Sequence, residues 1–487
     1  MSQPDAREGQ AGPPGESERP IVPSRPGNAG GGKGPWFRAN VRSGESREIG
    51  VSLLPPPKVR KLRETLHAKA KSAPAYRFYA LYDKMWRRDV LAFAYGCCFA
   101  NQGAAGVDGQ TFDDIEAYGW ERWVDELAEE LRGKTYRPQA VRRVYLPKPD
   151  GTQRPLGIPT IKDRVVQTAA LVVLEPIFAA DLQPEQYAYR PGRSALDAVQ
   201  QVQALVIQGH REVIDADLSG YFDSIPHAEL MKSVARRVSD RHLLHKRWLE
   251  APVEETDAQG RHRRTTRNKD EGRGTPQGAP LSPLLSNLYM RRFILGWKLL
   301  GHERRLDAHI VNDADDFVIC CRGTALEALT VMRDMLGRLK LTVHEAKTRR
   351  CRSPDEPFDF LGYTIGRCYW WKTGAAYIGV RPSDQKLLGL HREIHEQTGR
   401  WWLWLEPQEM VERLNRLLRG WASYFCLGTV TAAYRRVAAH VCYRLRRWLV
   451  RKYRVQGPGW SRFPDHYLYT ELGLLRLQRR PRGCSRA

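Results

Sequence analysis

Two strand-like segments that carry clustered aspartates constrain this fold more than any other feature of the sequence. Residues 212–218 alternate apolar and acidic side chains as a half-buried strand does, so Asp215 and Asp217 share one face of that strand. About 95 residues later, short apolar runs flank the polar segment 312–316, which predicts a β-hairpin with acids at its tip. Carboxylates crowded in this way repel one another unless a divalent cation neutralises them.

The type of ligand indicates which cations such a cluster would bind. Mg²⁺ prefers oxygen ligands and is usually bound by one or two carboxylates together with substrate phosphates. Two such ions, about 3.5–4 Å apart, can stabilise the attacking and leaving oxygens of a phosphoryl displacement. A lone pair of aspartates is more often a solvated turn, but here both acidic segments follow apolar runs. The pattern therefore predicts a two-metal site for phosphoryl transfer.

The charge of the chain indicates a polyanionic partner. Lys and Arg number 78 against 55 Asp and Glu, so the formal net charge is +23 and the pI is near 9.8. A charge this large on a folded protein favours nucleic acid as the partner. The alternative is a basic scaffold protein that is kept soluble by its charge.

Cysteine usage and hydropathy indicate a location. The nine cysteines include no Cys-x-x-Cys, so neither a zinc signature nor a disulfide framework is recognised, and a reducing compartment fits. The N-terminus has no apolar core typical of a signal peptide, and apolar runs such as 169–174 are far too short to cross a bilayer. We expect a cytoplasmic protein without a membrane partner.

Composition and periodicity divide the chain into several parts, as its 487 residues suggest. Strands and helices mix without βαβ regularity, which predicts an α+β fold with a helical C-terminal part. The predicted parts are a flexible Gly- and Pro-rich tail (1–55), an N-terminal extension with a first α+β region (56–210), a central acidic region (211–370), a helical basic region (371–455) and a short basic tail (456–487).

Local patterns predict the elements around the acids. Residues 142–146 and 154–159 read as strands of a hairpin, because the segment between them has turn composition. Residues 162–178 predict a helix, and so do residues 193–208, with Ser194 as its N-cap. Residues 358–365 predict a single strand.

The C-terminal region is strongly basic. Between residues 411 and 454 there are eleven Lys and Arg residues and one acid, Glu412. A stripe of basic residues lies opposite the apolar face of a predicted helix and consists of Arg436, His440, Arg444, Arg447 and Arg451. Such a run is usually a solvated face, but its single sign of charge favours contact with an RNA backbone or an RNA–DNA hybrid.

Motifs in consecutive order resemble the reverse transcriptases encoded by group II introns, also called maturases. The resemblance covers roughly residues 57–475. The matching segments are 144–151, 154–164, 189–194, 217–223, 273–284, the acidic tip, 347–348, 360–363 and 418–425. Each motif alone is weak, whereas their order is specific. The resemblance implies a right-hand polymerase with fingers, a palm and a helical thumb that also binds RNA for splicing.

The resemblance also implies roles for individual residues. Asp217, Asp315 and Asp316 match the catalytic palm carboxylates that bind two Mg²⁺ ions, for which Mn²⁺ is an alternative. Residues that match positions around the incoming deoxynucleoside triphosphate are Lys148 and Arg154 on the fingers, Phe222 as the residue that excludes a ribose 2′-hydroxyl, Gln277 in the loop that lines the pocket, and Lys347 as a candidate proton donor. The implied partners are template or intron RNA, a DNA primer or target, and deoxynucleoside triphosphates.

Two departures from the family pattern stand out. The pattern Tyr-Ala-Asp-Asp reads Asp-Ala-Asp-Asp here, so Asp313 adds a third carboxylate to the tip. Asp313 could disturb metal binding, repel the primer phosphate, or be tolerated with its side chain in water. After Cys442 only Cys484 remains, so a fused Cys-containing nuclease domain is not expected.

Several hypotheses therefore remain at this stage. The first is an active RNA-directed DNA polymerase that also acts as a splicing maturase. The second is a non-catalytic maturase or RNA chaperone whose polymerase is weakened by Asp313. The third is a domesticated reverse transcriptase used in DNA repair or phage defence. The sequence leaves open whether the protein is a monomer or a homodimer.

Overall fold

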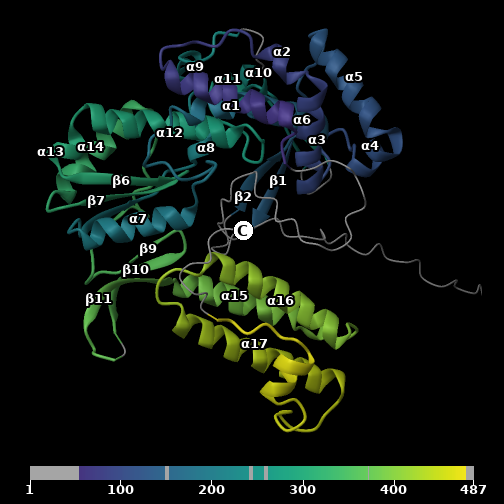
Figure 1. Cartoon of the computed structure of the whole chain (residues 1–487), viewed down its shortest axis with the longest axis vertical. Coiled ribbons are helices and arrows are strands. Elements are labelled where there is room, and N and C mark those ends of the chain that lie inside the picture. The colour runs from purple at the N-terminus through teal and green to yellow at the C-terminus, as the bar shows by residue number, and fades with distance from the viewer. Residues whose placement is uncertain (1–53, 148–152, 241–244, 257–260, 371, 479–487) are drawn as a thin grey trace, which may run out of the picture. The chain divides into compact units, whose positions relative to one another are not determined.

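The structure of the chain is a computed structural model (Figure 1). It describes residues 54–478 with the exception of 148–152, 241–244, 257–260 and 371. Residues 1–53 of the expected N-terminal tail, Lys148 and the last nine residues therefore lie outside the described part of the chain.

A four-stranded antiparallel sheet, here called the palm sheet, carries the acidic segments. Its strands, in the order β6-β7-β3-β8, are β3 (Glu212–Ala216), β6 (Ala308–Asp313), β7 (Asp316–Cys321) and β8 (Arg349–Arg352). Alternation sends Ile214 and Ile319 to one face and Val213 and Val318 to the other. Helices α12 (Ser282–Leu299) and α14 (Ala325–Arg338) cover the first face, and α7 (Ala195–Ile207) covers the second (Figure 1).

The predicted helix after residue 193 is confirmed together with its cap. Ser194 accepts a hydrogen bond from the backbone N–H of Asp197, and the Asp197 carboxylate accepts one from the N–H of Ser194. This reciprocal capping box satisfies two backbone donors at the start of α7. It fixes the helix that supports the palm sheet.

A second four-stranded sheet contains the predicted hairpin. It has the order β2-β1-β4-β5, with β1 (Val141–Pro147), β2 (Gln153–Ile158), β4 (Val253–Thr256) and β5 (His262–Thr265). β1 and β2 pair antiparallel as predicted, whereas β1 and β4 pair parallel. Helices α1 (Pro57–Ser72), α2 (Tyr82–Met85), α3 (Arg88–Asn101), α4 (Phe112–Tyr118), α5 (Trp120–Arg132) and α6 (Ile161–Ala179) precede or follow these first strands.

Helix α6 is the central element of this region. Its side chains are buried along almost the whole length, from Ile161 to Phe178, which is typical of a helix surrounded by other elements. Helices α1 and α3 pack against it. Short helices connect the remaining parts, namely α8 (Tyr221–Ser224), α9 (His227–Ala235), α10 (His245–Leu249), α11 (Arg267–Asp270) and α13 (His302–Arg305).

The segment 358–365 differs from its prediction. It forms two antiparallel strands, β9 (Phe358–Phe360) and β10 (Tyr363–Tyr369), because Leu361 and Gly362 adopt positive φ angles and reverse the chain. β10 then pairs with β11 (Ala376–Pro382) to complete a three-stranded sheet. The predicted domain boundary at residue 371 therefore falls inside a β-hairpin, and the helical region begins after it.

The C-terminal helices share a core of their own. They are α15 (Asp384–Gln397), α16 (Pro407–Tyr424) and α17 (Thr431–Lys452), with a 3₁₀ turn at Arg400–Trp402 and a π-helical turn at Tyr467–Glu471. The prediction of a mere tail after residue 456 is wrong for its described part. Phe463 and Leu468 are buried in this core, and the Asn415 amide binds the backbone of Gly473 and Leu475.

The α+β class with a helical C-terminal part is confirmed. Among the described residues, no helix combines the length and the apolar character that crossing a membrane requires.

Candidate active site

The palm sheet brings the three predicted aspartates to one end. Ala216 at the end of β3 pairs with Phe317 of β7, so the antiparallel register places Asp217 beside Asp316. Asp313 and Asp316 pair across the β6–β7 hairpin, and Asp315 lies in the turn between them. Four carboxylates therefore occupy the same end of three neighbouring strands.

The electrostatics of this end reflect burial first and the crowding of the acids second. Asp215 lies two residues before Asp217, so the alternation of the strand places both side chains on the same face of the sheet. Burial raises the pKa of Asp215 to about 6, the Arg349 guanidinium opposes this shift, and the negative charges of Asp316 and Asp217 add to it. An excess of negative charge thus gathers where the sequence predicts cations.

The turn that carries Asp315 is held in an unusual conformation. Ala314 has φ +61°, a region that L-residues other than Asn and Asp rarely adopt. The buried Asn312 amide donates a hydrogen bond of 2.8 Å to the Ala314 carbonyl, and the Asn312 backbone is itself bonded to Glu185 and Tyr187. Asn312 therefore positions the turn. Sequence reasoning assigned it no role, although an Asn directly before a turn is a recognisable signal.

Asp313 does not point to water. Its side chain is 0% exposed, and the pairing with Asp316 places it in the same row across the sheet. Of the alternatives left open by the sequence, tolerance of Asp313 through a solvent-facing side chain is therefore excluded. Its carboxylate is part of the packed tip of the hairpin.

Lys347 contacts Asp217 directly. The Lys347 ammonium nitrogen lies 3.1 Å from a carboxylate oxygen of Asp217. The backbone of the same segment also holds Asp217, because the His344 N–H donates to the Asp217 carbonyl at 2.8 Å and the Thr348 hydroxyl accepts from its N–H at 3.4 Å. The lysine thus supplies a positive charge at one of the clustered carboxylates.

Phe222 lies immediately after the acidic strand. It belongs to α8, is half-buried and packs against the main core. Its backbone carbonyl accepts a 2.7 Å hydrogen bond from the N–H of Thr275, and Gly274 donates to Ile225 at 2.9 Å. The glycine- and proline-rich loop that contains Gln277 is therefore anchored to the segment after Asp217.

The same loop contacts the predicted fingers strand. The Gly157 N–H of β2 donates a 2.6 Å hydrogen bond to the Gln277 carbonyl. Gly278, the next residue in the loop, has φ +110° and packs against the Gly157 backbone. A Cβ at this position would lie 2.4 Å from the Gly157 carbonyl oxygen, so only glycine is tolerated. Arg154 is exposed on β2, opposite Leu146 in the hairpin. Gln277 and the strand of Arg154 are thus joined, whereas Lys148 lies outside the described residues.

The comparisons with known proteins match this arrangement. Residues 146–365 match the family described as reverse transcriptase (RNA-dependent DNA polymerase), and residues 388–467 match the group II intron, maturase-specific domain. Protein YkfC of Escherichia coli (strain K12) is 31% identical over 349 residues, which are 63% of this chain and 88% of that protein. The chain belongs to the group II intron reverse transcriptase and maturase family.

Two intron-encoded relatives are longer than the region over which they align with this chain. Group II intron-encoded protein LtrA of Lactococcus lactis subsp. cremoris is 31% identical over 352 residues, which are 59% of this chain and 57% of LtrA. The putative COX1/OXI3 intron 1 protein of Saccharomyces cerevisiae is 22% identical over 434 residues, which are 73% of this chain and 51% of that protein. The chain thus spans just over half of these two relatives.

The fold is that of a right-hand polymerase, in which the palm sheet lies within the matched reverse transcriptase region. Reverse transcriptase domains use divalent metal ions, and the donors at this end of the palm sheet fit such ions. Asp217, Asp315 and Asp316 offer carboxylate oxygens, which hard divalent cations prefer, and Lys347 already places a cation against one of them. The two domains together imply binding of RNA and DNA.

The maturase region corrects the prediction of one exposed basic stripe. Arg436 and Arg447 are exposed, but Arg444 is only 6% exposed, and its guanidinium donates to the Thr398 hydroxyl at 3.0 Å and to the His395 carbonyl. His440 stacks on His391 with ring centroids 4.3 Å apart. Because α15 packs on this side of α17, Arg444 is covered by another helix and His440 is only partly exposed.

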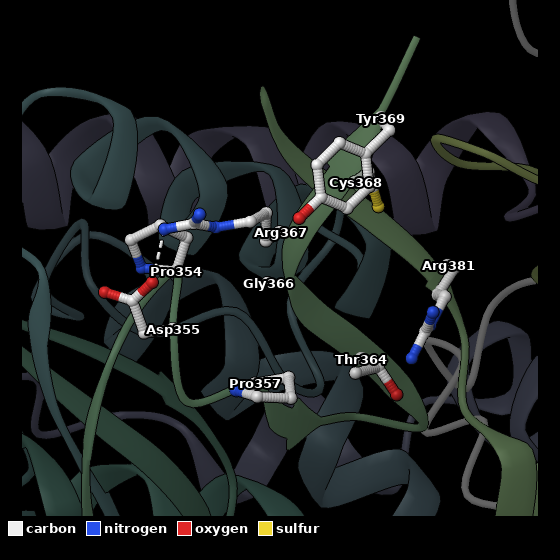
Figure 2. Close-up of a pocket in the computed structure, with 9 residues that line it drawn as sticks. All are labelled: Pro354, Asp355, Pro357, Thr364, Gly366, Arg367, Cys368, Tyr369 and Arg381. Atoms are coloured by element: carbon white, nitrogen blue, oxygen red, sulfur yellow. Dashed lines mark hydrogen bonds and ion pairs between the residues drawn. The ribbon is translucent and has the colours of Figure 1, made fainter. Parts of the chain in front are cut away.

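A cavity of about 250 Å³ is lined by residues other than Asp217, Asp315 and Asp316. Its lining comes from the segment 354–357 and from β10 and β11, and Figure 2 shows Arg367 turned toward Asp355, with which it forms an ion pair. Arg381 and Tyr369 line the same cavity. None of the predicted site residues lines it, so the candidate active site rests on the palm sheet.

Proposed function

We propose that this chain copies RNA into DNA by two-metal nucleotidyl transfer and uses its C-terminal region to bind intron RNA. The observation that carries this proposal is the meeting of Asp217, Asp315 and Asp316 at one end of the palm sheet within a matched reverse transcriptase region. We infer Mg²⁺ as the resident ion, with Mn²⁺ as an alternative, because all three donors are carboxylates.

The aspartates have a positioning role in this proposal. Two bound ions would polarise the primer 3′-hydroxyl and neutralise charge on the transferred phosphoryl group and its leaving group. The chain's contribution is to hold three carboxylates rigidly, through the register of β3, β6 and β7 and through the Asn312 bond to the hairpin turn. Rigid donors cost little reorganisation when the reaction occurs.

Lys347 has a role that depends on whether ions are bound. Without them, its ammonium group pairs with Asp217 at 3.1 Å and reduces repulsion among the acids. Cations bound to Asp217 would compete with this ammonium group, and Lys347 would then turn toward the triphosphate and donate a proton to the leaving pyrophosphate oxygen. The side chain is more than half exposed, so this movement meets little resistance.

The fingers residues are proposed to hold the incoming deoxynucleoside triphosphate. Arg154 is exposed on β2, and Lys148 directly follows β1 in the sequence. Guanidinium and ammonium groups are well suited to phosphate oxygens. The hydrogen bond from Gly157 to Gln277 links this hairpin to the loop of the nucleotide pocket. This link would hold Arg154 and Gln277 near the same triphosphate.

Phe222 is proposed to select the sugar. Its ring follows the metal-binding strand and is fixed from behind by the main core and by the Thr275 bond to its carbonyl. A bulky ring in this place leaves no room for a 2′-hydroxyl. A Phe222→Ala variant should therefore incorporate ribonucleotides more readily relative to deoxynucleotides, by on the order of 10–100-fold.

Primer extension on an RNA template with Mg²⁺ tests the central proposal. Asp217→Asn should reduce deoxynucleotide incorporation by on the order of 10³-fold, since loss of one electrostatic stabiliser already costs 10²–10³-fold. RNA binding by the same variant should be unchanged. Asp355→Asn, which changes an exposed aspartate outside the predicted site, is the matched control and should retain full activity. Full polymerisation by Asp217→Asn would show that the metal site is misassigned.

Asp313 distinguishes the active polymerase from a non-catalytic maturase. Asp313→Asn removes the charge with almost no change of volume, which suits a side chain that is fully buried. Asp313→Tyr restores the family residue but adds bulk. If the wild type is inactive and either variant extends the primer, the result favours the non-catalytic maturase. If the wild type itself extends the primer, the result supports the polymerase.

The maturase role is supported by the match of residues 388–467 to the maturase-specific domain. We propose that the exposed arginines Arg436 and Arg447, together with Arg451, contact RNA phosphates. Splicing of a group II intron RNA at near-physiological Mg²⁺, with and without the protein, tests this role. The domesticated alternative predicts no intron RNA sequences around the reading frame and no stimulation of splicing. A cytoplasmic location is part of the same proposal.

A further inference from the structure

Two histidines and an aspartate meet at the end of the palm sheet that is opposite to the catalytic hairpin. His210 lies two residues before β3, and His309 is the second residue of β6, directly after Asp307 and Ala308. One ligand atom from each of the three residues lies within 4.8 Å of those of the other two. β7 separates β3 from β6 in the sheet, so the cluster joins two strands that do not pair with each other.

The distances in the cluster suit a small tetrahedral ion. Nε2 of His210 lies 3.0 Å from Oδ1 of Asp307, and Nε2 of His309 lies 3.6 Å from the same oxygen. Ligands at about 2.0–2.1 Å from a tetrahedral Zn²⁺ are about 3.3 Å apart, which falls between these two distances. The imidazole rings are nearly perpendicular, at 83° with centroids 4.7 Å apart, so both can turn an edge toward a common point.

The outer hydrogen bonds orient both rings for coordination. Nδ1 of His210 lies 3.3 Å from the Leu205 carbonyl oxygen, and Nδ1 of His309 lies 3.2 Å from a carboxylate oxygen of Glu303. When Nδ1 of each ring donates to its acceptor, Nε2 is the nitrogen left to bind an ion, and the ion would replace the direct contacts between Nε2 and Asp307. A metal-bound histidine typically donates its other ring N–H to a carbonyl or a carboxylate in this way.

The remaining neighbours determine how the aspartate is presented. Nε of Arg322 lies 3.5 Å from Oδ2 of Asp307, so the guanidinium takes one carboxylate oxygen and the histidines share the other. Asp307 also adopts φ +42°, a left-handed conformation that Asp adopts more readily than most residues. His210 is buried, whereas Asp307 and His309 are partly exposed, so an ion and a water molecule can reach the cluster.

We propose that His210, Asp307 and His309 bind one transition-metal ion of the Zn²⁺ class, with water as the fourth ligand. Two imidazoles and one carboxylate suit Zn²⁺ and similar ions and do not suit Mg²⁺, which prefers oxygen ligands. This site is distinct from the aspartate site, because His309 and Asp313 are four residues apart on β6, about 13 Å along the strand. The ion ties the starts of β3 and β6 together and so stiffens the two strands whose far ends carry the aspartates.

Titration of the untagged full-length chain with Co²⁺ tests this proposal, because Co²⁺ replaces Zn²⁺ and absorbs visible light when bound in tetrahedral geometry. Millimolar Mg²⁺ in the buffer occupies the carboxylate site. We expect one equivalent of Co²⁺ to produce a visible absorption band, which Zn²⁺ then removes, and we expect Zn²⁺ to raise the Tm in a saturable way. A chain that gives no band and no Tm shift overturns the proposal.

Matched variants locate the ion. His309→Ala should abolish the band, and Glu303→Gln, which changes only an outer hydrogen bond, should weaken binding by on the order of 10–100-fold. His466→Ala, at an exposed histidine elsewhere, should bind as the wild type does. Asp217→Asn should also retain the band. A band that survives in His309→Ala, or one that disappears in Asp217→Asn, assigns the ion to another place and overturns the proposal.

Discussion

The buried guanidinium of Arg444 separates a structural arginine from an RNA-binding one. Arg444→Met removes the charge and keeps the length of the side chain. Arg447→Met makes the same change one turn along α17, where the guanidinium is exposed and donates to the Tyr443 hydroxyl. The two variants change net charge equally. They should nevertheless affect different properties of the protein.

The magnitude for Arg444 follows from its contacts. Its guanidinium donates to the Thr398 hydroxyl at 3.0 Å and to the His395 carbonyl at 3.3 Å, both at the end of α15. Hydrogen bonds that involve a charged group contribute about 1.5–3 kcal/mol each. Removal of the buried charge offsets part of the loss. We expect the free energy of unfolding to fall by about 2 kcal/mol in Arg444→Met and by less than about 0.5 kcal/mol in Arg447→Met.

Urea unfolding and RNA binding in a KCl series measure the two effects. Loss of one phosphate contact lowers the slope of log affinity against log salt by about 0.7–0.9. Arg447→Met should show this reduced slope with unchanged stability. Arg444→Met should be less stable but should bind RNA with the wild-type slope under conditions where it is folded. A stable Arg444→Met protein with a reduced slope would refute the assignment of Arg444 to the helix interface.

Three further variants test other contacts. Asn312→Ala should destabilise the hairpin tip by about 1–3 kcal/mol, since it leaves the Ala314 carbonyl without this donor. The variant should lower primer extension without loss of RNA binding. Equal primer extension by Asn312→Ala and wild type would contradict the positioning role of Asn312. Gly278→Ala should raise the KM for deoxynucleotides in primer extension, because a Cβ would lie 2.4 Å from the Gly157 carbonyl, whereas an unchanged KM would show that the loop yields freely. Burial lowers the pKa of His391 and of His440 below 6.5, so the folded state binds fewer protons than the unfolded state. The stability that these rings contribute is therefore present above pH 6.5 and is lost as the pH falls through their lowered pKa values. His391→Gln should therefore lose less stability than the wild type in urea unfolding between pH 7.5 and 5, and parallel curves for the two proteins would exclude the pair as the cause.

Much of the fold could be predicted because its signals are local. Alternation of apolar residues predicted β3 and the β6–β7 hairpin, and the cap at Ser194 predicted the start of α7. The turn at Leu361 and Gly362 was missed, because a short apolar run reads as one strand when the positive φ angles that reverse it are not visible. The burial of Phe463 was missed for a similar reason, since a basic segment with scattered apolar residues resembles a tail.

The candidate site divides in the same way. The carboxylates Asp217, Asp315 and Asp316 could be found because acids at strand ends are unusual in sequence and match a family motif. The contacts that support them could not be found, because the Asn312 bond to its turn and the Lys347 pair with Asp217 depend on how the chain returns in space. Helical spacing placed Arg444 on a polar stripe, yet α15 covers that side of α17.

The sequence by itself determined the chemistry that this protein has available, namely oxygen donors on adjacent strands, basic helices and an aspartate where the family has tyrosine. Residue type and spacing suffice for this, because strand alternation and helix periodicity act over a few residues. Only the tertiary structure decided which charged side chains are exposed to solvent and which are buried or paired with one another. It buried Asp313 and Arg444, paired Lys347 with Asp217, and brought His210 to Asp307, 97 residues later in the chain. Burial and electrostatic coupling depend on distance in space, which the order of residues along the chain does not contain.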